Sequence, residues 1–103
     1  MLDTIELSKK LISFDSVTPA KQDIFDFLIK TFEENGFVTK QLNFDGDGSY
    51  EVINIMATYG PTNTNGKHFN FLCHVDVVPP GNLEDWDTHP FEPTIKDLSL
   101  IHI

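Results

Sequence analysis

The spacing of apolar residues changes once along the chain, at Gly36, and this change constrains the fold more than any other feature. Before Gly36 the apolar residues recur at helical spacing, which predicts one helix over about residues 3–14 and a second from about residue 18 to residue 35. After Gly36 they alternate, which predicts strands. The predicted strands cover residues 37–44, 50–58 and 68–75. The last of them is short and mostly apolar, which favours an α/β sheet covered on both faces.

Single residues mark the expected ends of these elements, and Asp3 or Thr4 can cap the first helix. Thr18 followed by Pro19 suits the N-cap and the first turn of the second helix. Gly36 suits the left-handed position that closes a helix. In the first predicted strand Val38, Leu42 and Phe44 fall on one face because side chains alternate along a strand.

The composition is strongly acidic, with 16 Asp and Glu against 7 Lys and no Arg, and a net charge of −9. Such a chain lacks the basic face that a nucleic-acid partner or an anionic membrane surface requires. We therefore expect neither partner. The acidity is more typical of a solubility requirement than of electrostatic steering of a substrate.

The cysteine content and the N-terminal segment bear on the compartment. Cys73 is the single cysteine, which excludes an intrachain disulfide and fits a reducing environment. The first residues lack the basic and then apolar layout of a signal peptide, and no apolar run reaches the ~18 residues of a membrane span. We expect a cytoplasmic protein.

His74 and Asp76 are the strongest candidates for chemistry. They stand two apart at the carboxyl end of the last predicted strand, so both side chains should lie on one face. Ligands of open α/β sheets bind beyond such strand ends. A neutral imidazole is a good zinc ligand, and a neighbouring carboxylate can fix its tautomer. By spacing alone, a satisfied polar pair at a sheet margin is the more common explanation of two such residues.

The surrounding sequence carries a resemblance. The run FLCHVDVVPPG (71–81), then Trp86, then PFEPTIKD (90–97), with SVTP (16–19) earlier, resembles the zinc metallopeptidase family. That family contains succinyl-diaminopimelate desuccinylases, acetylornithine deacetylases and carboxypeptidases. The combination of HVDVVPPG, the Trp and PFEPTIKD is most similar to the desuccinylase branch. The resemblance runs from about Leu2 to Asp97.

This resemblance implies a fold and a site. Residues 1–97 would be the N-terminal portion of a zinc-peptidase-like catalytic domain, with helices packed on a mixed sheet. His74 matches the first metal-ligating histidine, and Asp76 matches the active-site acid that orients the site. Two zinc ions, or cobalt, would serve the hydrolysis of an N-acyl amino acid such as N-succinyl-LL-2,6-diaminopimelate, a step of bacterial lysine biosynthesis. The full-length enzyme would be a homodimer.

The resemblance also implies missing parts. The bridging aspartate, a glutamate pair that includes the general base, a further carboxylate ligand and a distal histidine would follow residue 103, so we expect no activity from this chain alone. The family continues after PFEPTIKD with a glycine, whereas Leu98 stands here. Residues 98–103, LSLIHI, resemble a translated sequencing adapter, and we expect them to be foreign to the natural protein. His102 is accordingly given no role.

The remaining candidate residues support only weaker predictions of a functional role. Cys73 should point away from His74 and be a small buried thiol. His68 is expected to be solvated, and His89 to be a loop residue. Asp45 and Asp47 lack the remaining features of a calcium loop, so residues 45–49 are expected to form a turn. Trp86 and Phe91 are expected to pin their loop against the core.

Two alternatives remain open from the sequence. The first is another branch of the same family, such as an acetylornithine deacetylase or a peptidase. The second is a small acidic domain without catalysis that binds a partner or, weakly, one metal ion.

Overall fold

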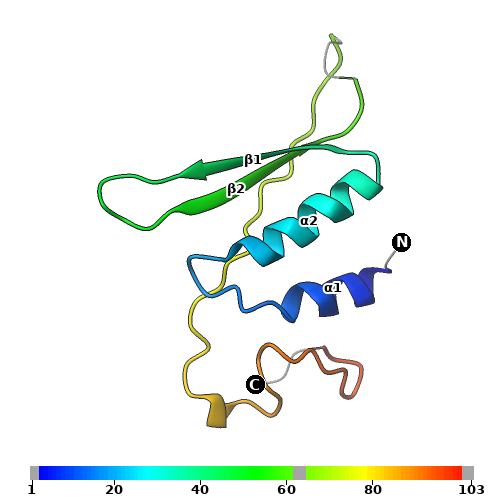
Figure 1. Ribbon diagram of the computed structural model, residues 1–103. Coiled ribbons are helices and arrows are strands. Elements are labelled where there is room, and N and C mark those ends of the chain that lie inside the picture. Colours follow the sequence, from blue (N-terminus) through cyan, green and yellow to red (C-terminus); the bar gives the residue numbers. More distant parts are fainter. Residues whose placement is uncertain (1–2, 62–64, 101–103) are drawn as a thin grey trace.

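The computed structural model describes residues 3–61 and 65–100. Two helices, α1 (Thr4–Ile12) and α2 (Gln22–Glu34), precede two strands, β1 (Val38–Phe44) and β2 (Val52–Thr58). A short 3₁₀ turn, η1 (Leu83–Asp85), interrupts the long C-terminal segment. In Figure 1 the β1–β2 hairpin, α2 and α1 form successive layers, and the segment after residue 80 lies beyond α1. Among the described residues, no helix is long and apolar enough to cross a membrane.

The N-terminus of α1 agrees with the sequence, but that of α2 does not. Asp3 caps α1, because its carboxylate accepts a hydrogen bond of 2.8 Å from the Glu6 amide. Helix α2 begins at Gln22 rather than at Thr18, so the predicted N-cap was wrong. Thr18 is instead held across the chain, where its N–H donates to Val77 O at 3.0 Å and its hydroxyl donates to Asp76 Oδ2 at 2.7 Å.

The C-terminus of α2 confirms the role predicted for Gly36. This residue has φ of +84°, and its amide donates to Glu33 O while the Phe37 amide donates to Phe32 O, each at 3.0 Å. The rings of Phe32 and Phe37 pack with centroids 5.1 Å apart. This closure turns the chain back so that β1 runs along α2.

Strands β1 and β2 form an antiparallel hairpin in which Phe44 pairs with Val52 and Val38 with Thr58. Helix α2 lies against one face only: Thr39 bonds Glu33, and Gln41 bonds Gln22. The opposite face carries Val38, Leu42 and Phe44, as the alternation predicted. That face is open, with 75% of Val38 and 60% of Phe44 exposed.

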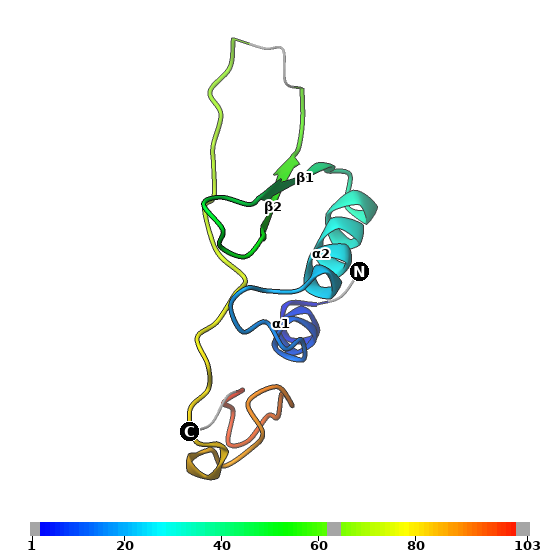
Figure 2. The same ribbon diagram turned by 60° about the vertical axis from the view of Figure 1, so that its left-hand side comes forward.

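The third predicted strand was wrong. Residues 68–75 pair with no other strand in the part of the chain that the structure describes, and Figure 2 shows them as a long unpaired trace. A segment forms a strand only where a neighbouring strand makes hydrogen bonds with its backbone N–H and C=O groups. Neither β1 nor β2 pairs with residues 68–75 in this way. The described sheet is therefore antiparallel rather than mixed. For the same reason Cys73, predicted to be buried, is exposed.

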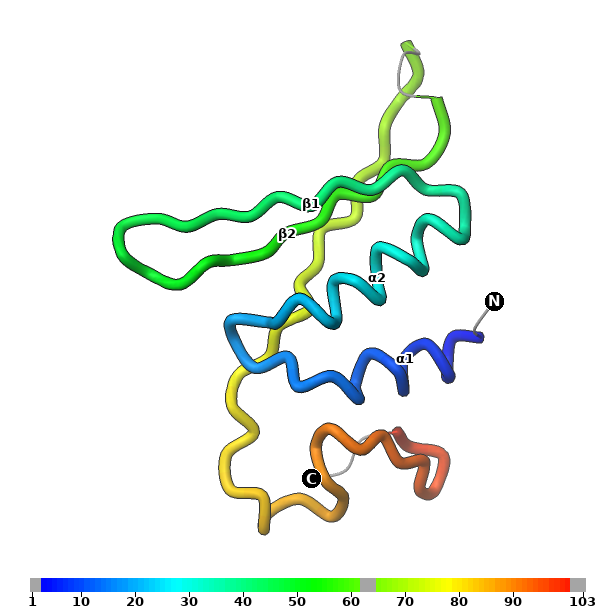
Figure 3. The backbone as a smooth tube through the Cα atoms, viewed as in Figure 1, coloured from blue at the N-terminus to red at the C-terminus, as the bar shows by residue number. Residues whose placement is uncertain are grey.

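The described core is small for 103 residues. Its buried apolar side chains are Ile24 and Phe25, with 2% and 5% of their surfaces exposed. The accessible surface of 8166 Å² exceeds by about 2,000 Å² what a compact protein of this mass exposes. The radius of gyration of 16.4 Å likewise exceeds the ~13 Å of a compact domain. The open path of the chain is visible in Figure 3.

Two phenylalanines should therefore differ sharply in their effect on stability. Phe25→Ala should lower the free energy of unfolding by about 3 kcal/mol, since it opens a cavity beside Ile24. Phe44→Ala should change it by less than about 0.5 kcal/mol, since the side chain is already in water. Urea unfolding followed by circular dichroism measures both, and equal losses would contradict this view of the core.

Candidate functional site

The site is organised by a single parallel bridge between Val17 and Val77. The Val77 amide donates to Ser16 O, and the Thr18 amide donates to Val77 O, both at 3.0 Å. Ser16 is 5% exposed and Val77 is 41% exposed, so the crossing joins a buried residue to a segment at the surface. The bridge brings the connection between α1 and α2 beside the segment that carries His74 and Asp76.

Both oxygens of the Asp76 carboxylate have partners. The Thr18 hydroxyl donates to Oδ2 at 2.7 Å, and Oδ1 lies 3.2 Å from Nδ1 of His74. The bond from Thr18 is the main cause that lowers the pKa of Asp76 below 3.8; partial loss of water opposes it, and His74 adds a smaller lowering effect. Sequence reasoning assigned Thr18 to a helix cap and missed this contact. The run SVTP (16–19), part of the family resemblance, was the available signal that Thr18 belongs to the site.

The imidazole of His74 is oriented by Asp76. Nδ1 lies 2.9 Å from the backbone oxygen of Asp76 and 3.2 Å from its carboxylate oxygen. Both neighbours are acceptors only, so Nδ1 must carry the proton and Nε2 the lone pair. The side chain is 83% exposed. The predicted pair thus lies together and leaves one nitrogen available to a ligand.

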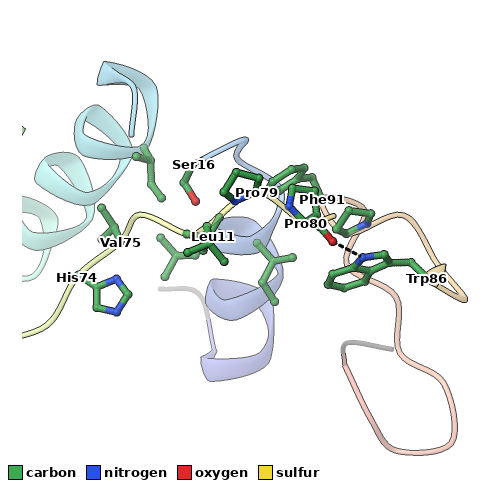
Figure 4. Close-up of a pocket in the computed structure, with 13 residues that line it drawn as sticks. Leu11, Ser16, His74, Val75, Pro79, Pro80, Trp86 and Phe91 are labelled. Carbon is green, nitrogen blue, oxygen red and sulfur yellow. Dashed lines mark hydrogen bonds between the residues drawn. The ribbon is translucent and has the colours of Figure 1, made fainter. Parts of the chain in front are cut away.

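Two cavities flank this pair. The smaller, of about 350 Å³, is lined by Thr18, His74, Asp76, Val77 and Val78. The larger, of about 570 Å³, is almost wholly apolar and lies between α1 and the segment 75–91. Figure 4 shows His74 at one end of it and Trp86 at the other. His74, Val77 and Val78 line both cavities, so the imidazole borders both of them, and the smaller one also contains the polar groups of Thr18 and Asp76.

The loop that closes the larger cavity is held by Trp86. Its indole N–H donates to Pro80 O at 3.0 Å, which Figure 4 draws as a dashed line. This bond ties Trp86 to its own segment, and the packing of Trp86 and Phe91 against the core stays a prediction. Phe91 lines the same cavity. The double proline and Trp86 therefore form one local unit beside the site.

The other candidates take no part in the site. His68 is exposed, as expected, and His89 accepts a local bond from the Phe91 amide within its loop. Residues 46–49 form the expected turn, closed by a bond from the Ser49 amide to Gly46 O. His102 lies outside the described residues.

Comparison with known proteins finds relatives of this chain. No family model matches it. Over 97 residues, 94% of the chain, it is 45% identical to the succinyl-diaminopimelate desuccinylase of Pelagibacter ubique. The desuccinylases of Wolbachia sp. subsp. Brugia malayi and Methylococcus capsulatus are 42% and 40% identical over 97 residues each. The chain is a relative of the succinyl-diaminopimelate desuccinylases. It spans about a quarter of the length of these relatives, 24% in the first case.

The side chains around His74 and Asp76 can be compared with the ligand set that a metal site requires. Within residues 3–61 and 65–100, no group of three or more His, Cys, Asp and Glu side chains could hold a metal ion. A zinc site needs three or four protein ligands. However, an imidazole with its Nδ1 proton bonded to a carboxylate is the arrangement that ligating histidines adopt. The residues present therefore fit a single ligand, His74, supported by Asp76.

The contact with Thr18 predicts how Asp76 titrates. Its folded-state pKa is lowered, so the hydrogen-bonded carboxylate should persist above pH 3.8 and be lost as the pH falls through the lower value. Thr18→Val should raise the midpoint, measured by carbon NMR of the carboxyl group. Thr39→Val removes a similar hydroxyl–carboxylate bond, to Glu33, and should leave the Asp76 midpoint unchanged. A midpoint insensitive to Thr18→Val would contradict the assignment.

Proposed function

We propose that this chain supplies one corner of the active site of a metal-dependent amidohydrolase that cleaves N-succinyl-LL-2,6-diaminopimelate into succinate and LL-2,6-diaminopimelate. The observation that carries the proposal is the His74–Asp76 pair, in which Nδ1 lies 2.9 Å and 3.2 Å from two oxygens of Asp76 and Nε2 is left for a ligand. The names of the relatives support the choice of substrate.

In this proposal each residue of the pair has one role. His74 donates the Nε2 lone pair to a metal ion. Asp76 holds the imidazole in the required tautomer and raises its basicity. Two zinc or cobalt ions, when bound, would polarise the amide carbonyl and lower the pKa of the attacking water toward about 7. The exposed face of the imidazole leaves room for further ligands to approach.

Those further ligands are proposed to come from outside these 103 residues, together with a glutamate as general base. The small core and the surplus of exposed surface support this view, because both are expected of a polypeptide that packs against additional chain. We therefore propose that residues 1–97 are part of a larger catalytic domain and that the chain alone is inactive. A cytoplasmic location and a homodimeric full-length enzyme remain part of the same proposal.

The alternatives are weaker. The relatives named above are all desuccinylases, which does not favour an acetylornithine deacetylase. An independent acidic binding domain would need a larger core than Ile24 and Phe25 provide.

The backbone at Leu98 bears on the proposal that residues 98–103 are foreign to the natural protein. Asp97 and Leu98 have φ of +51° and +65°, in a two-residue turn closed by bonds of 2.9 Å between Lys96 and Ser99. Such turns favour glycine, because a side chain at positive φ costs roughly 1–2 kcal/mol. The resemblance places a glycine at this position, which supports the proposal.

A chimaera tests the proposed function. Residues 1–97 would replace the matching segment of the Pelagibacter ubique desuccinylase, and release of LL-2,6-diaminopimelate would be measured with zinc present. We expect turnover within about tenfold of the parent enzyme, since the substituted segment is 45% identical. His74→Ala in the chimaera should reduce kcat/KM by at least about 10³-fold, the scale of losing a metal ligand.

Two controls separate folding from chemistry. His89→Ala removes an imidazole from the same segment without touching the site, and it should retain activity. The 103-residue chain alone should show no turnover. Activity of that chain, or a chimaera that folds and binds zinc but is inactive on this substrate, would refute the proposal.

A further inference from the structure

Thr18 is a third polar residue of the site, beside His74 and Asp76. Neither the sequence motif around His74 nor the names of the relatives assign it a role. It lies in the connection between α1 and α2, 58 positions before Asp76. Its side chain lines the same 350 Å³ cavity as His74 and Asp76. The three polar groups follow one another through space as Thr18, Asp76 and His74.

The backbone fixes where the Thr18 hydroxyl can lie. The Thr18 amide donates to Val77 O, and the Val77 amide donates to the carbonyl of the preceding Ser16, both at 3.0 Å. These two bonds hold residue 18 directly beside the residue that follows Asp76. The hydroxyl has a single proton and two acceptors in reach, Asp76 Oδ2 at 2.7 Å and Val77 O at 3.2 Å. The shorter bond, to the charged oxygen, is the stronger of the two.

The carboxylate of Asp76 cannot turn freely while both of its oxygens are occupied. If the bond to Oδ2 is lost, rotation about the side-chain bonds of Asp76 can carry Oδ1 away from His74. The imidazole then keeps only the backbone oxygen of Asp76 as an acceptor for its Nδ1 proton. Thr18 thus acts on His74 at a distance, through the orientation of Asp76.

We infer that Thr18 is a positioning residue: its hydroxyl fixes the Asp76 carboxylate, which in turn keeps the His74 proton on Nδ1 and the Nε2 lone pair free for a metal ion. The inference rests on the proposed function in one respect, that a metal ion is the ligand that binds the Nε2 lone pair. That Thr18 orients Asp76, and through it His74, is inferred for the metal-free chain.

The test is the tautomer of the neutral His74 imidazole, read by nitrogen-15 NMR of the metal-free 103-residue chain. In the unmodified chain Nδ1 should be protonated and Nε2 should not. Thr18→Val should lower the ratio of the Nδ1–H to the Nε2–H tautomer about fivefold, the change expected from losing one ordinary hydrogen bond. Thr18→Ser keeps the hydroxyl and should keep the ratio within about twofold of the unmodified chain.

Two further variants distinguish positioning from a general effect on folding. Thr39→Val loses a comparable hydroxyl–carboxylate bond, to Glu33, and should leave the His74 tautomer unchanged. In an Asp76→Ala background, Thr18→Val should have no additional effect on the ratio, because the intermediary is gone. Contacts between Val17 and Val77 in the NMR spectra report whether each variant keeps the bridge.

The inference is overturned if Thr18→Val retains the original ratio with the bridge intact, or if Thr18→Ser behaves like Thr18→Val. It is also overturned if the effect persists without Asp76, or if the unmodified chain lacks the Val17–Val77 contact. The measurement contains no metal ion and no substrate. It can therefore fail while the desuccinylase proposal stands, and it can succeed while that proposal fails.

Discussion

The parallel bridge between Val17 and Val77 is the contact on which the rest of the site depends. Its two hydrogen bonds join the connection between the helices to the segment that returns from the hairpin. Ser16 is buried whereas 41% of Val77 is exposed, so water is excluded from one side of these bonds only. Thr18 is placed beside Asp76, and Asp76 beside His74, as consequences of this one crossing. Both cavities also border on Val77.

The elements that depend on local chemistry could be predicted from the sequence, whereas those that depend on distant partners could not. Asp3, Gly36 and the turn at residues 46–49 act through bonds within a few residues, and the structure agrees with each prediction. Residues 68–75 have the composition of a strand, but strand formation requires a neighbour. Their exposure, and that of Cys73, follows from the absence of one among the described residues.

In the candidate site, too, contacts between residues close in sequence could be predicted, whereas a contact between distant residues could not. A spacing of two predicted that His74 and Asp76 would share a face, and the contact between Nδ1 and the Asp76 oxygens agrees with this. Thr18 was missed because the dipeptide Thr-Pro is a good helix start by local criteria. Its actual partner is 58 positions away, and no local pattern reports such a contact. The roles of His74 as a metal ligand and of Asp76 as an active-site acid stay predictions.

Amide hydrogen exchange of the 103-residue chain tests the central claim, that the Val17–Val77 bridge holds the site together, most directly. The amides of Thr18 and Val77 are both bonded across the bridge, while those of Phe71 and Cys73 lie in the unpaired segment. The account predicts that Thr18 and Val77 exchange markedly more slowly than Phe71 and Cys73, because exchange requires the bridge to open. Equal, unprotected exchange at all four amides would contradict it.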